Sequence, residues 1–428
     1  MNILVIGNGF DLAHGLPTKY TDFLEFCKLF TDCYRKRQNS TIDRIYNDIG
    51  QRTKTFLNMW FRDYYEKGQS KEKNSVKLIE EFNNSVKDNF WINYFLQCDM
   101  HGDENWIDFE SEISQIIQSI DTDMNSSISQ HYTLEDKIQN ISNKFVNEYY
   151  AYWSPERTYK GLRDKLLADL NRLIRAFEIY LTKYVEKIEC RLLSPDIQEI
   201  ILKKNRKSDE MSTYDTYVLS FNYTNTYQKL YGDKVQEYTE KYIDYIHGKA
   251  DINGTIENNN MVLGIDEYLS DDRKNRDMDF IAFKKFYQRI YKQTGCKYKN
   301  WTDRIRRDYF EHLYKFENVA YMKQGYMSDS IQRMSNERAI SALKNEECPK
   351  HNLYIFGHSL DVTDGDILRD LILNDNVYTT IYYHNKDVMG QQIANLVKVI
   401  GQDELIKRTG GSTKTIEFKQ QQDIILIE

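Results

Sequence analysis

An asparagine and a histidine each follow a short apolar run, the position at which an open α/β sheet places its ligand crevice. Asn222 comes after residues 217–221, and His247 follows residues 242–246. Asn222 lies in or just past its run, where no helix cap is needed, which favours a side chain that faces a ligand. Histidine titrates near neutral pH, as a general base does. A structural interpretation stays open, in which the polar residues after Asn222 cap a helix and the histidine is a buried structural group.

A glycine-rich turn follows the first apolar run. Residues 3–6 are wholly apolar and lead into Gly7-Asn8-Gly9. In a doubly wound α/β sheet, backbone N–H groups of this turn hold a pyrophosphate, and glycine lets the backbone approach it closely. The G-x-G-x-x-G fingerprint is not met, because its third glycine position holds Leu12. A phosphate-binding turn and a tight strand-to-helix turn are both consistent with this pattern.

Another polar turn, Gly357-His358-Ser359-Leu360-Asp361, lies late in the chain. Gly357 and Ser359 could admit a ribose or a phosphate. His358, Asp361 and Asp364 could be turn residues or metal ligands. We expect no metal, since short acidic turns with one histidine are common on protein surfaces. A serine-hydrolase elbow is excluded, because the G-x-S-x-G motif requires glycine where Asp361 stands.

Short apolar runs alternate with helical segments, which favours an α/β fold with a doubly wound, parallel, Rossmann-like sheet. All the polar turns follow such runs, and the carboxyl ends of parallel strands form the ligand crevice of an open sheet. We expect a helix at 391–399 and strands at 3–6, 217–221, 242–246, 261–265, 353–357, 379–383 and 415–418.

The predicted strands lie in separated stretches, so the predicted core is discontinuous. We expect residues 1–20, 211–268 and 350–428 to form it, with helical insertions at 21–210 and 269–349. Such insertions cost little, because loop-closure entropy grows slowly with loop length.

Within the first insertion, apolar residues recur at helical spacing from Phe109 to Ile120 and from Leu162 to Ile188. We interpret both stripes as packing surfaces. Glu110 lies in the segment 106–110, Trp-Ile-Asp-Phe-Glu. It is either a buried carboxylate that contacts the core or part of the acidic first turn of a helix.

The net charge of −7 gives no global basic field for nucleic acid. Basic residues from Arg273 to Lys285 are interleaved with aspartates, so we interpret this stretch, with Lys284, as a solvated helix face. The cysteines form no C-x-x-C pair, which disfavours a zinc ribbon. No apolar run of about 18 residues exists, and the N-terminal run is too short for a signal peptide. We therefore expect a cytoplasmic protein that does not span a membrane.

Taken in order, the polar turns resemble the sirtuin pattern. Gly7-Asn8-Gly9 stands where sirtuins have Gly-Ala-Gly, and Phe221-Asn222 resembles the Gln-Asn of their Thr-Gln-Asn-Ile-Asp motif. His247-Gly248 matches the catalytic His-Gly, and residues 357–360 match Gly-Thr-Ser-Leu. The zinc-binding cysteines of deacetylating sirtuins are missing, and Thr224 replaces the aspartate of the motif.

Residues 7–18, 106–110, 220–224 and 357–361 closely resemble the AbiH family of bacterial phage abortive-infection proteins, which is related to sirtuin-like effectors. The resemblance implies an antiviral enzyme that hydrolyses NAD to nicotinamide and ADP-ribose without a metal. The implied catalytic residues are Asn222 and His247. The implied cofactor-binding residues are Gly7, Asn8 and Gly9 for the pyrophosphate, Asp11 for a ribose, and Gly357 and Ser359 for a phosphate or the adenine ribose.

The implied partners are NAD or a related nucleotide and a phage-derived trigger. The helical insertions offer positions for a sensor or a homo-oligomer interface. Four alternatives stay open: a nucleotide-binding sensor without turnover, a deacylase, a metal-dependent nuclease that uses Asp361, Asp364 and His358, and a structural interaction protein.

Overall fold

The computed structural model of the chain describes residues 1–35, 51–67, 73–99, 108–126, 159–202, 216–232, 242–324 and 348–426. Its centre is a six-stranded parallel sheet with the order β4-β3-β1-β5-β6-β7. The strands are β1 (Asn2–Ile6), β3 (Thr216–Ser220), β4 (Ile243–Tyr245), β5 (His351–Phe356), β6 (Val377–Tyr383) and β7 (Ile416–Gln420). Counted along the chain, this is the 3-2-1-4-5-6 order of the Rossmann fold.

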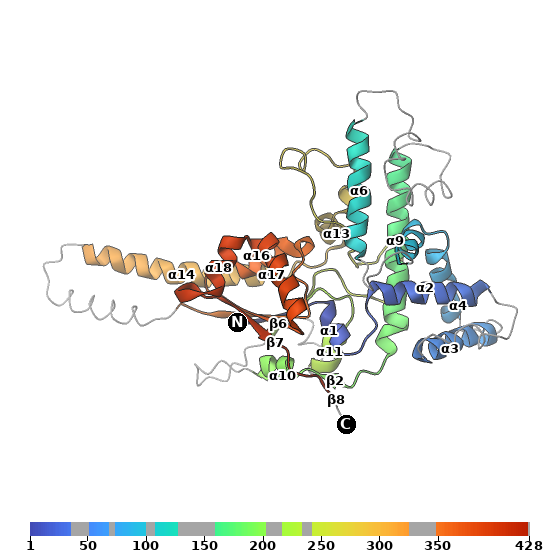
Figure 1. Cartoon of the computed structure of the whole chain (residues 1–428), viewed down its shortest axis with the longest axis horizontal. Coiled ribbons are helices and arrows are strands. Elements are labelled where there is room, and N and C mark those ends of the chain that lie inside the picture. The colour runs from blue at the N-terminus through green and yellow to red at the C-terminus, as the bar shows by residue number, and fades with distance from the viewer. Residues whose placement is uncertain are drawn as a thin grey trace.

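Helices cover both faces of the sheet (Figure 1). Alternate residues of each strand point to opposite faces, and both faces are apolar. Ile3 and Val5 of β1 pack in one apolar cluster, and Leu4 and Ile6 pack in another. The first cluster includes α14 (Tyr298–Gln324), α16 (Gly365–Ile372), α17 (Lys386–Ile400) and α18 (Gln402–Thr409). The second includes α1 (Asn8–Ala13), α10 (Pro195–Leu202) and α11 (Thr226–Tyr231). The predicted doubly wound α/β fold is therefore confirmed.

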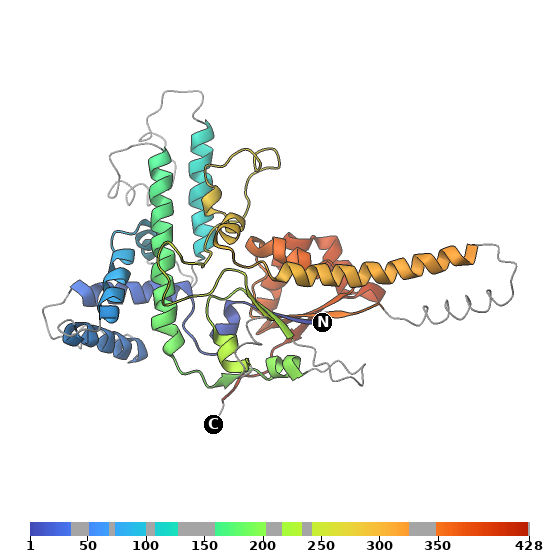
Figure 2. The same ribbon diagram turned by 180° about the vertical axis from the view of Figure 1, so that it is seen from behind.

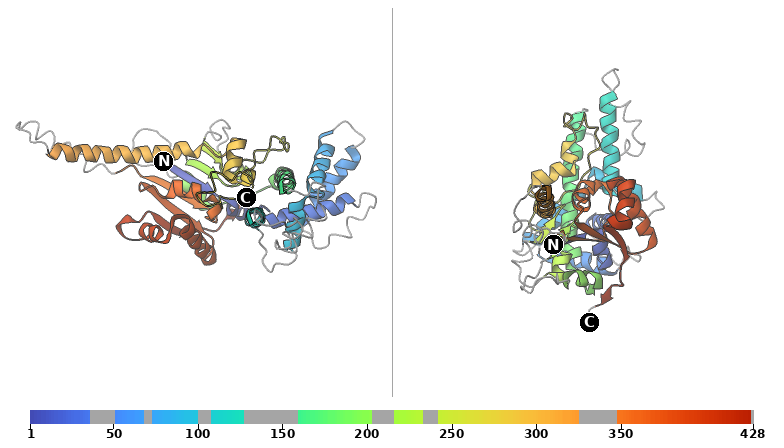
Figure 3. Two further views of the ribbon diagram at one scale, coloured as in Figure 1. Left: turned by 90° about the horizontal axis from the view of Figure 1, so that it is seen from above. Right: turned by 90° about the vertical axis from the view of Figure 1, so that its left-hand side faces the viewer.

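A separate group of helices packs around a third apolar cluster, in which α6 (Phe109–Ser126) runs alongside the long helix α9 (Tyr159–Lys183) (Figure 2). The predicted stripe from Leu162 to Tyr184 is buried in this cluster, as are Phe109, Ile113, Ile116 and Ile120. The helices are α2 (Tyr20–Arg35), α3 (Gln51–Lys67), α4 (Lys73–Val86), α5 (Phe90–Asp99), α6 (Phe109–Ser126) and α9 (Tyr159–Lys183). This helical group and α14 extend from opposite ends of the sheet (Figure 3).

The smaller elements complete the described chain. β2 (Leu192–Leu193) and β8 (Ile425–Leu426) form a separate antiparallel pair. Four 3-10 turns are η3 (Val185–Lys187), η4 (Ile281–Phe283), η5 (Val362–Asp364) and η6 (Gly411–Thr413). Within the ranges given above, no helix is both long enough and apolar enough to cross a membrane.

Two predicted elements are wrong. Residues 261–265 are not a strand of the sheet: Met261, Leu263 and Ile265 instead pack in the helical cluster, and Ile265 makes an isolated bridge to Lys284. The second insertion is not helical from its start, since residues 270–284 form turns and the short η4, and α13 (Lys285–Lys292) begins only afterwards. A buried apolar run does not reveal whether its partner is a sheet or a helix.

Candidate active site

A cavity of about 200 Å³ lies at the carboxyl edge of the sheet, beside β1 and β5. Chain order reverses between these two strands, which is where open α/β sheets bind ligands. Ile6 pairs with both Ser220 and Phe356, so the turns that follow β1, β3 and β5 meet at one level. The cavity brings together every predicted site residue, namely Gly7, Asn8, Gly9, Asp11, Asn222, His247, Gly357 and Ser359.

The glycines of these turns let two backbone segments touch. A Cβ on Gly9 would lie 2.8 Å from Gly357 Cα, and Gly357 has a φ of +66° with no room for a Cβ beside Phe10 N. Gly9 N donates to Gly357 O at 2.8 Å, and Gly7 N donates to Phe356 O at 3.2 Å. Two N–H groups of the predicted pyrophosphate turn are thus engaged within the protein, which gives these glycines a packing role.

Asp11 is buried on α1 with one oxygen engaged. Thr224 Oγ1 donates to Asp11 Oδ2 at 2.6 Å, and Thr226 Oγ1 lies 3.0 Å from Thr224 Oγ1. Asp11 Oδ1 has no hydrogen-bond partner among the described residues. Burial raises the pKa of Asp11 to about 6, although the hydroxyls of Thr224 and Thr226 act to lower it, as does the nearby amide of Asn222, which makes no hydrogen bond to it. The carboxylate is therefore mostly ionised at pH 7.

Asn222 lies in the turn after β3, where the Ser220 hydroxyl fixes its backbone. Ser220 Oγ accepts from Asn222 N at 3.2 Å and donates to Asn222 O at 3.1 Å. The side chain is buried and lines the cavity, yet neither Nδ2 nor Oδ1 has a partner in the part of the chain that the structure describes. Buried amides almost always make hydrogen bonds, so this amide is poised for a ligand or a water molecule.

His247 follows β4 and is oriented by Asp364, whose pattern in the sequence predicts only a turn residue or a metal ligand. His247 Nε2 lies 3.2 Å from Asp364 Oδ1. Burial lowers the pKa of His247 to about 4, although the negative charge of Asp364 acts to raise it. The imidazole is therefore neutral at pH 7. Because Asp364 can only accept, we assign the proton to Nε2, which leaves Nδ1 as a free lone pair. Nδ1 has no partner within the described ranges.

Asp364 belongs to a buried charge cluster around Lys285. Lys285 Nζ lies 3.1 Å from Asp364 Oδ1 and 2.6 Å from Glu110 Oε2, and the lysine side chain is 2% exposed. His358 Nε2 lies 3.5 Å from Asp364 Oδ2. Although burial opposes it, Lys285 and His247 hold the pKa of Asp364 well below its usual range. Burial raises the pKa of Glu110 to about 7, although Lys285 acts to lower it.

These contacts contradict the expected solvated face at Lys284 and Lys285 and agree with both interpretations of Glu110. Lys284 and Lys285 are not on a solvated face, because both are buried and ion-paired, Lys284 with Glu267 at 2.8 Å. Glu110 lies in the first turn of α6 and also contacts the charge cluster, so both interpretations of it hold. Residues 106 and 107 of its motif lie outside the described residues.

The metal-site alternative has little geometric support. Asp361 accepts from Thr363 N at 3.0 Å as a turn cap, and Asp364 already faces the Lys285 ammonium group. No group of three histidine, cysteine, aspartate or glutamate side chains in the described ranges is arranged to hold a metal ion.

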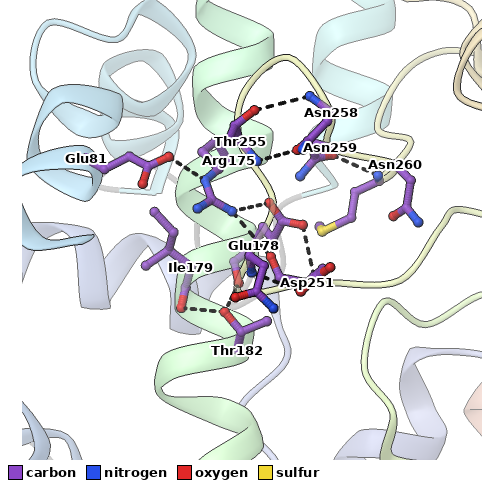
Figure 4. A network of polar contacts seen from close by, with 12 residues as sticks. Glu81, Arg175, Glu178, Ile179, Thr182, Asp251, Thr255, Asn258, Asn259 and Asn260 are labelled. Atoms are coloured by element: carbon purple, nitrogen blue, oxygen red, sulfur yellow. Dashed lines mark hydrogen bonds and ion pairs between the residues drawn. The ribbon is translucent and has the colours of Figure 1, made fainter. Parts of the chain in front are cut away.

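A buried ion network fixes the loop that follows His247 (Figure 4). Arg175 on α9 contacts Glu81 at 2.8 Å and Glu178 at 2.5 Å, and Glu178 Oε1 accepts from Asp251 N at 3.0 Å. The far end of the same loop returns to the site, where Val262 N donates to His247 O at 2.7 Å. The helical group therefore helps to position His247.

Comparison with known protein families identifies the chain's family. The family model described as bacteriophage abortive infection AbiH matches residues 3–384, a span that contains all the turns of the cavity. No curated protein and no solved structure matches the chain.

Proposed function

The chain belongs to the AbiH family of bacteriophage abortive-infection proteins, and from this premise we propose that it defends cells by hydrolysing NAD⁺ to nicotinamide and ADP-ribose. Asn222 and His247 are the proposed catalytic residues. The remaining lining residues of the cavity, with Asp11, Asn8 and Ser359 among them, bind the dinucleotide in this proposal.

One observation carries the proposal: buried polar atoms without partners converge on one cavity. The Asn222 amide, His247 Nδ1 and Asp11 Oδ1 have no hydrogen-bond partner among the described residues. Two of these groups are acceptors and the amide is both donor and acceptor, which matches ribose hydroxyls and a water molecule. The sirtuin-like order of the turns adds independent support.

The proposed reaction needs little acid catalysis. Water adds to C1′ of the nicotinamide ribose while the C1′–N bond breaks, and its electron pair neutralises the pyridinium nitrogen. His247 Nδ1 takes the proton that the water loses. The transition state resembles an oxocarbenium ion, as in glycoside cleavage. Asp364 accepts from Nε2 and keeps Nδ1 available, and Asn222 orients the water or the ribose.

The cavity is small for a ligand site, which bears on the conformation of the enzyme before it is triggered. Its volume of about 200 Å³ is below the about 300–1,000 Å³ of common small-molecule sites. This space is small for a whole dinucleotide, so we propose a resting form that opens further on a phage-derived trigger. A substrate of the nucleotide pool also points to action in the cytosol.

Release of nicotinamide from NAD⁺ by the purified chain, with lysate of phage-infected cells added as the source of the trigger, tests the proposal. We expect release that persists in EDTA and falls about 100-fold or more in His247→Ala and in Asn222→Ala. His384→Ala is the matched control, because this histidine is exposed and lies outside the cavity lining. Equal release by all variants would refute the site. Binding of NAD⁺ without product, with lysate of infected cells added, would favour a sensor.

A further inference from the structure

The side chains that line the cavity favour a positively charged ligand. The carboxylates of Asp11, Glu110 and Asp364 line it, as do the rings of Tyr20 and Phe177. No lysine or arginine from the described ranges is among its lining residues. Aromatic faces and carboxylates both attract positive charge, whereas a phosphate group would find no cationic side chain in this lining.

Asp11 is the carboxylate of this lining that lacks a counter-ion. Lys285 forms ion pairs with both Glu110 and Asp364. Across the described chain, no cation lies within ion-pair distance of Asp11. Burial lowers the pKa of Lys229, and the charge of Asp11 is among those that act to raise it. Lys229 Nζ nevertheless donates to the backbone carbonyl of Glu186, at 2.9 Å, and not to Asp11.

Burial makes an unpaired carboxylate unusual. Asp11 is 1% exposed, and Thr224 occupies only Oδ2. Buried charges in proteins are normally paired. Resting on the proposed function, we propose that Asp11 is the counter-ion of the ligand, so that the cavity selects the positively charged N-ribosyl pyridinium of NAD⁺ over the uncharged dihydropyridine of NADH.

The same charge would assist the reaction. As the C1′–N bond breaks, the positive charge moves from the pyridinium ring to the ribosyl carbon. A fixed carboxylate beside both atoms stabilises the cation throughout, without a further proton transfer. The reduced nucleotide carries no positive charge at this end, so Asp11 gives it no such stabilisation.

The test uses two ligands that differ in this charge and cannot be hydrolysed. They are the carbocyclic analogue of NAD⁺, in which CH₂ replaces the oxygen of the nicotinamide ribose, and its reduced form. We expect the full chain to bind the oxidised analogue about tenfold or more tightly in calorimetry. Asp11→Asn keeps an acceptor for Thr224 and should bring the ratio close to one. No preference in the wild type, binding of neither ligand, or an unchanged preference in Asp11→Asn would overturn the proposal.

A titration of the wild type covers the case that Asp11→Asn does not fold. Between pH 8 and pH 5 the preference should disappear, because Asp11 takes up a proton with a pKa of about 6. Glu186 and Lys229 are the charged groups around Asp11, and Glu110 faces the same cavity. The titration is therefore repeated in Glu110→Gln. A preference that stays constant over this range in both proteins would overturn the proposal.

Failure of NAD⁺ hydrolysis and failure of the counter-ion role of Asp11 give different results. Charge-selective binding that depends on Asp11, without nicotinamide release from NAD⁺, would refute hydrolysis and keep the counter-ion. Nicotinamide release by a protein whose preference is independent of Asp11 would do the reverse.

Discussion

Replacing Lys285 with methionine should lower the free energy of unfolding by about 3–5 kcal/mol at pH 8, the usual cost of removing one partner from a buried ion pair. The Nζ atom lies 2.6 Å from Glu110 Oε2 and 3.1 Å from Asp364 Oδ1, and only 2% of the side chain is exposed. Methionine fills most of the same space, so the loss comes from two carboxylates left without a cation rather than from a cavity.

The loss in Lys285→Met should depend on pH. Burial raises the pKa of Glu110 to about 7 even though Lys285 acts to lower it. Without the lysine, Glu110 stays protonated near pH 6 and only Asp364 remains charged. His247 and His358 still contact Asp364. We therefore expect a smaller loss at pH 6 than at pH 8.

Urea denaturation at both pH values, followed by circular dichroism, measures this difference. Lys284→Met is the matched control, because Lys284 is equally buried but has one carboxylate partner, Glu267, which is 28% exposed and can return to water. Its loss should be about 1 kcal/mol. Equal losses in the two variants, or a loss in Lys285→Met that does not change with pH, would refute the reasoning.

Three further outcomes follow from the same geometry. Folded Glu110 keeps its proton up to about pH 7, whereas an unfolded glutamate loses its proton near the ordinary pKa of 4.5. This group therefore lowers the free energy of unfolding as pH rises between these two values, by up to about 1.4 kcal/mol per pH unit. Glu110→Gln should remove that fall in denaturation series from pH 4.5 to 7, and an unchanged slope would contradict the assignment. Gly357→Ala should lower the free energy of unfolding by about 3 kcal/mol or more, because the added Cβ meets the Phe10 backbone. Gly401→Ala, also at positive φ but in open space, should lower it by about 1 kcal/mol. Thermal unfolding measures both losses, and equal losses would contradict the close contact. Asp364→Asn should reduce nicotinamide release by about 100-fold or more with little change in NAD⁺ binding, because the amide no longer fixes the proton of His247 on Nε2, and wild-type kinetics in this variant would count against the tautomer.

The sheet and the cavity lining were predictable because both follow from local patterns. Apolar runs such as residues 3–6 and 353–357 end in polar turns, and parallel pairing brings the carboxyl ends of such strands to one edge. Asn222 and His247 follow two such runs, so their approach to Gly357 required only the correct fold class.

The charge cluster was not predictable in the same way. Lys285 and Asp364 are 79 positions apart, and their contact depends on how α13 packs against η5. In the sequence Lys285 stands in a run of alternating charges, which is the usual pattern of a solvated face. Glu110 carries a weak signal in the motif of residues 106–110, but the sequence indicates no partner for it.

The turn after β3 contacts a carboxylate that it does not itself supply. The Thr224 hydroxyl donates to Asp11 at 2.6 Å. A carboxylate is therefore present beside Asn222, but it is supplied by α1 instead of by the turn after β3.

The measurement that tests the central claim most directly is the NAD concentration of phage-infected bacteria that express this chain. We predict that NAD falls before lysis in cells with the wild type, and that Asn222→Ala abolishes both this fall and the protection against phage, with the variant present at equal abundance. Protection by the wild type at constant NAD, or full protection by Asn222→Ala, would contradict defence through NAD hydrolysis at this site.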